Sequence, residues 1–153
     1  MSAVLSEMPL LRPMVPGDLD GVIRIERMIY EHPWTLGNFR DSLHAGYSCW
    51  MLECGGSVAG YGVLMIGVQE AHVLNLSVAR EWQRCGLGRY LLQHFIAIAQ
   101  SEDARCILLE VRPSNIPARA LYAQAGFREL YVRSGYYPGA QGREDAILMG
   151  LDL

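Results

Sequence analysis

The sequence predicts an α/β fold in which about four helices flank one mixed β-sheet, within a single domain of residues 1–153. Three observations lead to this prediction. The length is that of one domain. Hydrophobic residues make up 51% of the chain and charged residues 19%, which is enough apolar material for a sizeable core. Helix-like and strand-like patterns alternate, and short turns between consecutive strands require antiparallel pairs.

The first third of the chain predicts a strand followed by two helices. Leu10–Met14 is short and apolar, as a strand would be. Apolar residues then recur at helical spacing over Asp18–Tyr30, where Asp18 is placed to cap the free amides of the first turn. Pro33 interrupts this pattern, because the residue before a proline avoids the helical region. A second helix is expected over Leu36–His44.

The rest of the chain predicts six strands and two helices. The strands are Ser48–Glu53, Ser57–Ile66, His72–Val78, Cys106–Val111 and a final pair, Arg128–Arg133 with Ala146–Asp152. The helices are Leu87–Gln100 and Pro117–Ala125. A Gly-Gly pair at 55–56 suits a hairpin turn, and Gly126 stands just past a helix end. A loop rich in Gly and Tyr, Ser134–Asp145, is expected between the last two strands.

Charge and composition exclude several classes of protein. The formal net charge is −3, so the basic excess of a nucleic-acid-binding surface is missing. No apolar run approaches the roughly 20 residues of a membrane helix. The four cysteines and four histidines show no metal-ligand spacing, so no metal is expected. The cysteines are interpreted as reduced thiols in a cytoplasmic protein.

A phosphate-binding loop is predicted at Gln83–Gly88, between a strand and a helix. Glycines let backbone amides turn toward a ligand, and a helix start adds unpaired N–H groups and a dipole that favours anions. Arg84 and Arg89 add positive charge. Leu91 stands where a dinucleotide-binding loop needs its third glycine, and Arg89 where a Walker loop needs lysine. A strand-to-helix turn that binds nothing is the alternative.

Two motifs together resemble the GNAT acetyltransferase family over nearly the whole chain. The first is Gln83-Arg84-x-Gly86-x-Gly88, and the second is the pattern N-x-x-A-x-x-L-Y-x-x-x-G-F over Asn115–Phe127. The resemblance implies a mostly antiparallel sheet of six to seven strands that splays between strands 4 and 5. It also implies acetyl-CoA as cosubstrate. The expected contacts are Leu76, Ser77, Val78, Arg84, Cys85, Gly86, Leu87, Gly88, Arg89 and Asn115.

Within this family, three segments resemble the bacterial enzymes that acetylate the N-terminal alanine of a ribosomal protein. They are His32-Pro33-Trp34, Leu109–Asn115, and Tyr136–Pro138 followed by Glu144–Ala146. The resemblance implies direct attack of the acceptor amine within a ternary complex. Lysine side chains or small amines are alternative acceptors, and a non-catalytic module that binds acetyl-CoA is an alternative of another class.

Glu110 and Tyr122 match the general base and the general acid of the family. Spacing alone favours a salt bridge of Glu110 with Arg112, and the resemblance reverses that order; Tyr122 could instead pack in the core. A tyrosine with an ordinary pKa near 10 is protonated at neutral pH and can donate a proton. A covalent route through Cys85 or Cys106 is the competing mechanism, although neither has a histidine beside it in the sequence.

The acceptor is expected at Trp34, Tyr136 and Tyr137, which match the family's acceptor-binding segments. Trp34 could instead anchor its loop to the core. Gly135 replaces the asparagine that bacterial members often carry before the two tyrosines, which leaves local hydrogen bonding open. Glu144 and Asp145 could pair with a basic peptide, but a solvated charge pair is commoner. The histidines are interpreted as structural or surface residues, and His72 alone as a residue that could face the cleft.

Overall fold

The computed structural model describes residues 8–139 and 142–153. The chain forms two compact units. Unit 1 consists of Met1–Met65 and Asn75–His94, and unit 2 of Ile66–Leu74 and Phe95–Leu153. Strand β4 (Glu70–Val78) and helix α3 (Leu87–Ser101) each contribute residues to both units.

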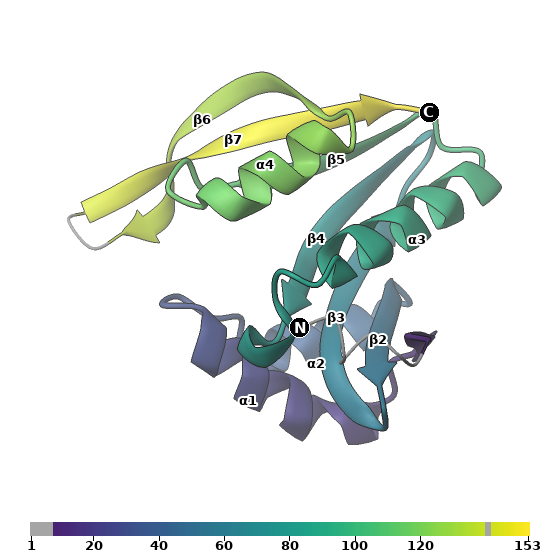
Figure 1. The fold of residues 1–153 in the computed structure, drawn as a ribbon. Helices are drawn as coiled ribbons and strands as arrows, with labels where there is room; N and C mark the ends of the chain where they lie inside the picture. Colours follow the sequence, from purple (N-terminus) through teal and green to yellow (C-terminus); the bar gives the residue numbers. More distant parts are fainter. Residues whose placement is uncertain (1–7, 140–141) are drawn as a thin grey trace. The chain divides into compact units, whose positions relative to one another are not determined.

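Of the remaining elements, those up to Trp82 lie in unit 1, apart from Ile66, and those from Cys106 onward lie in unit 2. Figure 1 labels most of them. The first set is β1 (Leu10–Pro13), the 3-10 turn η2 (Pro16–Asp18), α1 (Leu19–Ile29), α2 (Leu36–His44), β2 (Ser48–Cys54), β3 (Ser57–Ile66) and η3 (Arg80–Trp82). The second set is β5 (Cys106–Val111), α4 (Ile116–Gln124), β6 (Arg128–Gly139) and β7 (Gly142–Asp152).

The strands hydrogen-bond in the order β1-β2-β3-β4-β5-β7-β6. Strand β4 pairs with β5 in parallel, and β1 with β2, β2 with β3, β5 with β7 and β6 with β7 are antiparallel. The prediction of a mixed, mostly antiparallel sheet with four flanking α-helices is therefore confirmed. The parallel register joins Glu70–Val73 to Cys106–Leu109 and stops before either strand ends, at the place where the family resemblance implies a splay.

Alternating burial along β5 shows which face of the sheet each of its side chains points to. Ile107, Leu109 and Val111 are buried, whereas Leu108 and Glu110 on the opposite face are half-buried. Successive side chains of a strand point to opposite faces of the sheet, so Glu110 projects from the more open face. The apolar face of β5 belongs to the core, which leaves its one carboxylate available for other interactions.

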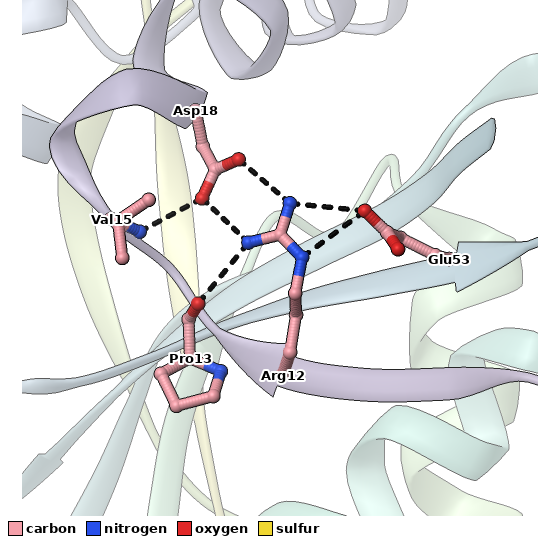
Figure 2. Close-up of polar contacts among 5 residues, drawn as sticks. All are labelled: Arg12, Pro13, Val15, Asp18 and Glu53. Carbon is pink, nitrogen blue, oxygen red and sulfur yellow. Dashed lines mark hydrogen bonds and ion pairs between the residues drawn. The ribbon is translucent and has the colours of Figure 1, made fainter. Parts of the chain in front are cut away.

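A charged network in unit 1, here called the Arg12 cluster (Arg12, Asp18 and Glu53), ties β1 to η2 and β2 (Figure 2). The Arg12 guanidinium donates to both carboxylate oxygens of Asp18 at 2.8 and 2.9 Å, and to Glu53 Oε2 at 3.0 and 3.1 Å. Asp18 Oδ2 also accepts from the backbone amide of Val15 at 2.8 Å. Its side chain makes no capping bond to α1, so the predicted cap is wrong. The Arg12 guanidinium and the Val15 amide occupy the carboxylate oxygens of Asp18 that would otherwise cap the helix.

The loop predicted over Ser134–Asp145 is wrong for most of its length. Strands β6 and β7 continue through it and form a long hairpin, visible in green and yellow in Figure 1. The register shifts between Arg133 and Tyr137, where the extra residues form a bulge that a strict alternation of side chains does not reveal. Residues 140–141 of the predicted loop lie outside the described residues.

The other elements agree with the sequence within one or two residues. Gly55 and Gly56 have φ of 58° and 81°, the left-handed pair that a tight hairpin turn requires. Pro117 lies in the first turn of α4, and Gly126 follows the helix with φ of 101°. Within the described residues, no helix is long and apolar enough to cross a membrane.

Candidate active site

The predicted phosphate loop lies in unit 1, between η3 and α3. Arg84 and Gly86 have φ of 63° and 83°, so the backbone turns sharply at both. The Gln83 side chain donates to the carbonyl of Val78 at 2.9 Å, which ties the loop to the end of β4. Leu87 is buried in a small apolar cluster that Cys85 also contacts. The loop is thus fixed at both ends, while Arg84 and Gly86 remain exposed.

The first turn of α3 supplies amides suited to an anion. Its first helical bond runs from the amide of Tyr90 to the carbonyl of Gly86, so the amides of Leu87, Gly88 and Arg89 have no intrahelical acceptor. A helix start of this kind, next to two left-handed residues and exposed arginine side chains, fits a pyrophosphate. The observation agrees with the loop's predicted chemistry.

The other predicted cofactor residues have clear local roles. Ser77 is buried, and its carbonyl approaches Gly60 so closely that a Cβ there would lie 2.6 Å away, which only glycine permits. The carbonyl of Leu76 accepts from the Tyr30 hydroxyl at 3.3 Å. In unit 2, Asn115 caps α4, because its Oδ1 accepts from the Ala118 amide at 3.3 Å.

Glu110 lies among three elements of unit 2, in what is here called the Glu110 cluster (Glu110, His72 and Arg133). His72 Nε2 of β4 is 3.6 Å from Glu110 Oε1, and Arg133 Nη1 of β6 is 3.8 Å from Oε2. Within the described residues, Glu110 Oε2 is buried without a hydrogen-bond partner. A carboxylate that lacks a hydrogen bond at one oxygen can accept a proton there or bind an ammonium group.

Burial and the charge of Glu110 also act on the neighbouring titratable groups. Burial lowers the pKa of His72, against the charges of Glu110 and Glu70 that raise it, so the imidazole is neutral at neutral pH. Burial, followed by the charge of Glu110, raises the pKa of Tyr137 to about 12 and also raises the pKa of Tyr136. Both phenols therefore stay protonated.

Tyr122 lies on α4 of the same unit and is buried, 7% exposed. Its ring is tilted against Phe127 at a centroid distance of 5.9 Å. The carbonyl of Tyr122 also accepts from the amide of Phe127 at 3.0 Å, just past the helix end. This packing agrees with the alternative that Tyr122 has a structural role in the core. It also fixes the position of the phenol, which a proton donor needs.

The two predicted acceptor tyrosines are held by charged side chains of the β6–β7 hairpin and of the segment after β5. The guanidinium of Arg112 lies over the Tyr137 ring at 4.4 Å, and its Nη1 donates to the carbonyl of Pro138 at 2.6 Å. Glu144 accepts from Arg112 at 3.2 Å and from the amide of Ser114 at 2.9 Å. Sequence reasoning missed this clamp, because its members are up to 32 residues apart.

The open question at Gly135 also has a structural answer. Its φ is 59°, and its amide donates to Asp145 Oδ1 at 2.9 Å. Asp145 therefore supports the bulge before Tyr136, and Glu144 supports Tyr137 through Arg112. Both carboxylates, expected to be solvated or to pair with a peptide, bind the chain itself.

Trp34 lies in unit 1, where a buried glutamate holds its backbone. Glu26 is 1% exposed; its Oε2 accepts from the Trp34 amide at 2.9 Å and its Oε1 from the Tyr61 hydroxyl at 2.7 Å. Burial raises the pKa of Glu26. The Trp34 ring packs on Phe39 at 5.0 Å. These contacts favour the anchoring role of Trp34, and its half-buried ring keeps part of its surface exposed.

The cysteines are poorly placed for a covalent route. Cys85 packs against the apolar cluster of unit 1, and its thiol lies 3.5 Å from the carbonyl of Gln83. Burial and then the charges of Glu70 and Asp152 raise the pKa of Cys106, so little thiolate forms. In the part of the chain that is described, no group of three His, Cys, Asp or Glu side chains gathers as metal ligands do.

Comparison with known proteins finds relatives over nearly the whole chain. A sequence model of the acetyltransferase (GNAT) family matches residues 19–127. The [ribosomal protein bS18]-alanine N-acetyltransferase of Escherichia coli K12 is 37% identical over 136 residues, which cover 89% of this chain and 92% of that protein. The protein of the same name from Haemophilus influenzae is 31% identical and covers 89% and 93%. The crystal structure of the ribosomal-protein-S18-alanine N-acetyltransferase from Escherichia coli matches with a TM-score of 0.88, at 35% identity and over 95% and 94% of the two chains.

Proposed function

The chain belongs to the acetyltransferase (GNAT) family, and on that premise we propose that it transfers acetyl from acetyl-CoA to the N-terminal alanine of a small-subunit ribosomal protein. The relatives that share a third or more of its sequence over nearly their full length are named for this activity. We infer that the chain acts as one N-acetyltransferase domain in the cytoplasm, without nucleic acid or membrane as a partner. The observation that carries the proposal is Glu110, a carboxylate with one oxygen unsatisfied.

The donor is proposed to bind through the phosphate loop. The left-handed backbone at Arg84 and Gly86 and the free amides of Leu87, Gly88 and Arg89 suit a pyrophosphate. Leu76–Val78 and Asn115 stay predicted contacts, by their match to the family. Acetyl-CoA supplies a thioester whose carbonyl carbon accepts the amine.

Glu110 is proposed as the general base. An N-terminal amine has a pKa of about 7.7–8.0, so at neutral pH it must lose a proton before it can attack. The unsatisfied Oε2 of Glu110 can take that proton, directly or through a water molecule. The neutral amine then attacks within a ternary complex, and no acetyl group passes through Cys85 or Cys106.

Tyr122 is proposed as the general acid. The thiolate that leaves needs a proton, and a protonated phenol can donate one. Packing against Phe127 fixes the ring on α4, in the same unit as Glu110. The acid and the base therefore come from neighbouring elements of the chain, β5 and α4.

Aromatic side chains are proposed to bind the acceptor's N-terminus. Tyr136 is 40% exposed, and its ring lies edge-on to Tyr137 at 4.9 Å. Rigid aromatic side chains such as this pair accept a small first residue such as alanine without losing much side-chain entropy. Trp34, in unit 1, stays a predicted acceptor contact by its match to the family.

Mass spectrometry of peptides incubated with acetyl-CoA tests the proposal. Peptides that start with alanine, peptides that start with methionine, and N-blocked peptides that contain lysine are compared. We expect acetyl groups on the N-terminus of the alanine peptides, with fragment ions that exclude lysine. Acetylation confined to blocked lysine peptides would contradict the N-terminal assignment. Binding of acetyl-CoA without turnover of any peptide would show a non-catalytic module.

A further inference from the structure

A histidine of β4 faces the proposed base and has no assigned role. His72 is in parallel register with Leu108, two residues before Glu110 on the same face of β5. Its Nε2 lies 3.6 Å from Glu110 Oε1, and the two side chains are 24% and 15% exposed. Both residues belong to unit 2 and to paired strands, so the sheet itself fixes their spacing.

The charges around His72 suit a group that gains a proton and loses it again. Glu110 of β5 and Glu70 of β4 stabilise its protonated form, whereas burial and Arg133 of β6 favour the neutral one. The His72 imidazole is therefore neutral before the reaction, and the carboxylates of Glu110 and Glu70 stabilise the imidazolium that forms when it takes up a proton. A neutral imidazole with its proton on Nδ1 offers the lone pair of Nε2 to Glu110.

The reaction needs a group of this kind. A general base is most effective when its pKa lies near the working pH, and among ordinary side chains the imidazole meets that condition. The acceptor's ammonium group gives up two protons in each turnover: one before the attack, which the base removes, and one as the amide forms, which balances the proton that the leaving thiolate gains. A carboxylate that keeps the first of these protons is neutralised, and it must pass the proton on before it can act again.

We propose that His72 is the proton-accepting partner of Glu110: it takes up at Nε2 the proton that Glu110 removes from the acceptor's ammonium group. This inference rests on the proposed function. One N–H bond of the ammonium breaks, its electron pair stays on nitrogen for the attack, and an N–H bond forms at Nε2. The product is an imidazolium next to the Glu110 carboxylate. The 3.6 Å separation is bridged by a small approach of the side chains or by one water molecule.

Kinetics across pH separate this role from a structural one. His72→Gln keeps the size of the side chain but cannot take up a proton, and His44→Gln, on the exposed end of α2, is the matched control. With an alanine peptide, we expect kcat of His72→Gln to fall by at least about tenfold, as loss of acid–base help does. We also expect the fall of kcat at acid pH, where His72 of the wild type becomes protonated, to move or disappear. Acetyl-CoA affinity and urea unfolding should match the wild type, and His44→Gln should match it in every respect. A kcat of His72→Gln within twofold of the wild type from pH 6 to 9 overturns the proposal.

An imidazole titration by NMR tests the pairing without turnover. The His72 signal is identified by its absence from the spectrum of His72→Gln. In Glu110→Gln the pKa of His72 should fall below its wild-type value, because one of the charges that raise it is gone. An unchanged titration overturns the proposal even if a variant is inactive. A wild type that acetylates no peptide defeats the proposed function and the proton transfer with it, whereas an active wild type with an unaffected His72→Gln defeats the proton transfer alone.

Discussion

The Arg12 cluster of unit 1 and the Glu110 cluster of unit 2 contain similar side chains, but their carboxylates are satisfied to very different degrees. Arg12 makes four hydrogen bonds of 2.8–3.1 Å to Asp18 and Glu53. Glu110 has the neutral His72 at 3.6 Å and the guanidinium of Arg133 at 3.8 Å, and its buried Oε2 has no hydrogen bond among the described residues.

This difference in hydrogen bonding distinguishes carboxylates that stabilise the fold from a carboxylate that can take part in catalysis. A carboxylate saturated with short hydrogen bonds stabilises the fold and has little left to offer a substrate. A carboxylate that the fold leaves under-satisfied costs stability, and such groups gather at functional sites. Burial alone does not make the distinction, because Glu26 is more buried than Glu110 but has a donor at each oxygen. The number of satisfied oxygens is therefore a better guide than exposure.

Removal of the under-satisfied carboxylate should have the largest effect on activity. Glu110→Gln cannot take the amine proton, so kcat/KM with an alanine peptide should fall by about 10²–10⁴-fold. Glu53→Gln is the matched control and should keep kcat/KM within twofold. Steady-state assays of both variants check the comparison. A similar loss in the two would show that the satisfied and the unsatisfied carboxylate do not differ in function.

Loss of the phenol should have the next largest effect. Tyr122→Phe keeps the packing on Phe127 but removes the proton donor, so kcat should fall by about 10–100-fold, the low end of acid–base effects. Urea unfolding should stay close to the wild type. The assignment of Tyr122 as the acid fails if kcat stays within twofold while Glu110→Gln is inactive.

Loss of the guanidinium should affect stability alone. Arg12→Met removes the guanidinium that donates to the carboxylates of Asp18 and Glu53, and should lower the free energy of unfolding by about 1–3 kcal/mol. Arg128→Met is the control, because the side chains of its ion pair with Asp152 are 71% and 81% exposed and such pairs contribute about 0–1 kcal/mol. Urea denaturation measures both. Equal losses in the two variants would mean that the Arg12 cluster is an ordinary surface pair.

The smallest effect expected is the pH dependence of the stability that the Arg12 cluster contributes. The hydrogen bonds from Arg12 lower the pKa of Asp18. A carboxyl group with a lowered folded-state pKa stabilises the fold above its unfolded pKa of about 3.9, and that contribution is lost as the pH falls through the folded value. The stability difference between the wild type and Asp18→Asn should therefore shrink between pH 6 and pH 3 in urea titrations. A stability difference that does not change with pH would show that Asp18 does not stabilise the fold through its charge.

The sequence predicted local elements well because their signals are local. Helices α2 and α3 and strands β3 and β5 begin where the apolar period or a turn residue indicates. The GNAT motifs predicted the family and the mixed sheet, and both are confirmed. The two strands of the β6–β7 hairpin were predicted, but their extension into Ser134–Asp145 was missed because the bulge near Gly135 breaks the alternation that marks a strand.

The site was predictable only in part, because its contacts join distant residues. Glu110 stood out as a carboxylate in an apolar strand, but Arg133 and the Arg112–Glu144 clamp had no signal in spacing. Glu26 did have one: it follows Leu19, Val22 and Ile23 on the buried stripe of α1, where a charged residue needs a partner. The roles of Glu110, Tyr122 and the aromatic residues stay predictions until variants are assayed.

The most direct test of the central claim is the pH dependence of the Glu110→Gln defect. The ratio of wild-type to variant kcat/KM is measured with an alanine peptide from pH 6.5 to 9.5. If Glu110 removes the amine proton, the ratio should narrow above about pH 8, because the free amine is then already neutral. A ratio that stays constant over this range would show that Glu110 contributes through binding or structure, and would contradict its role as the base.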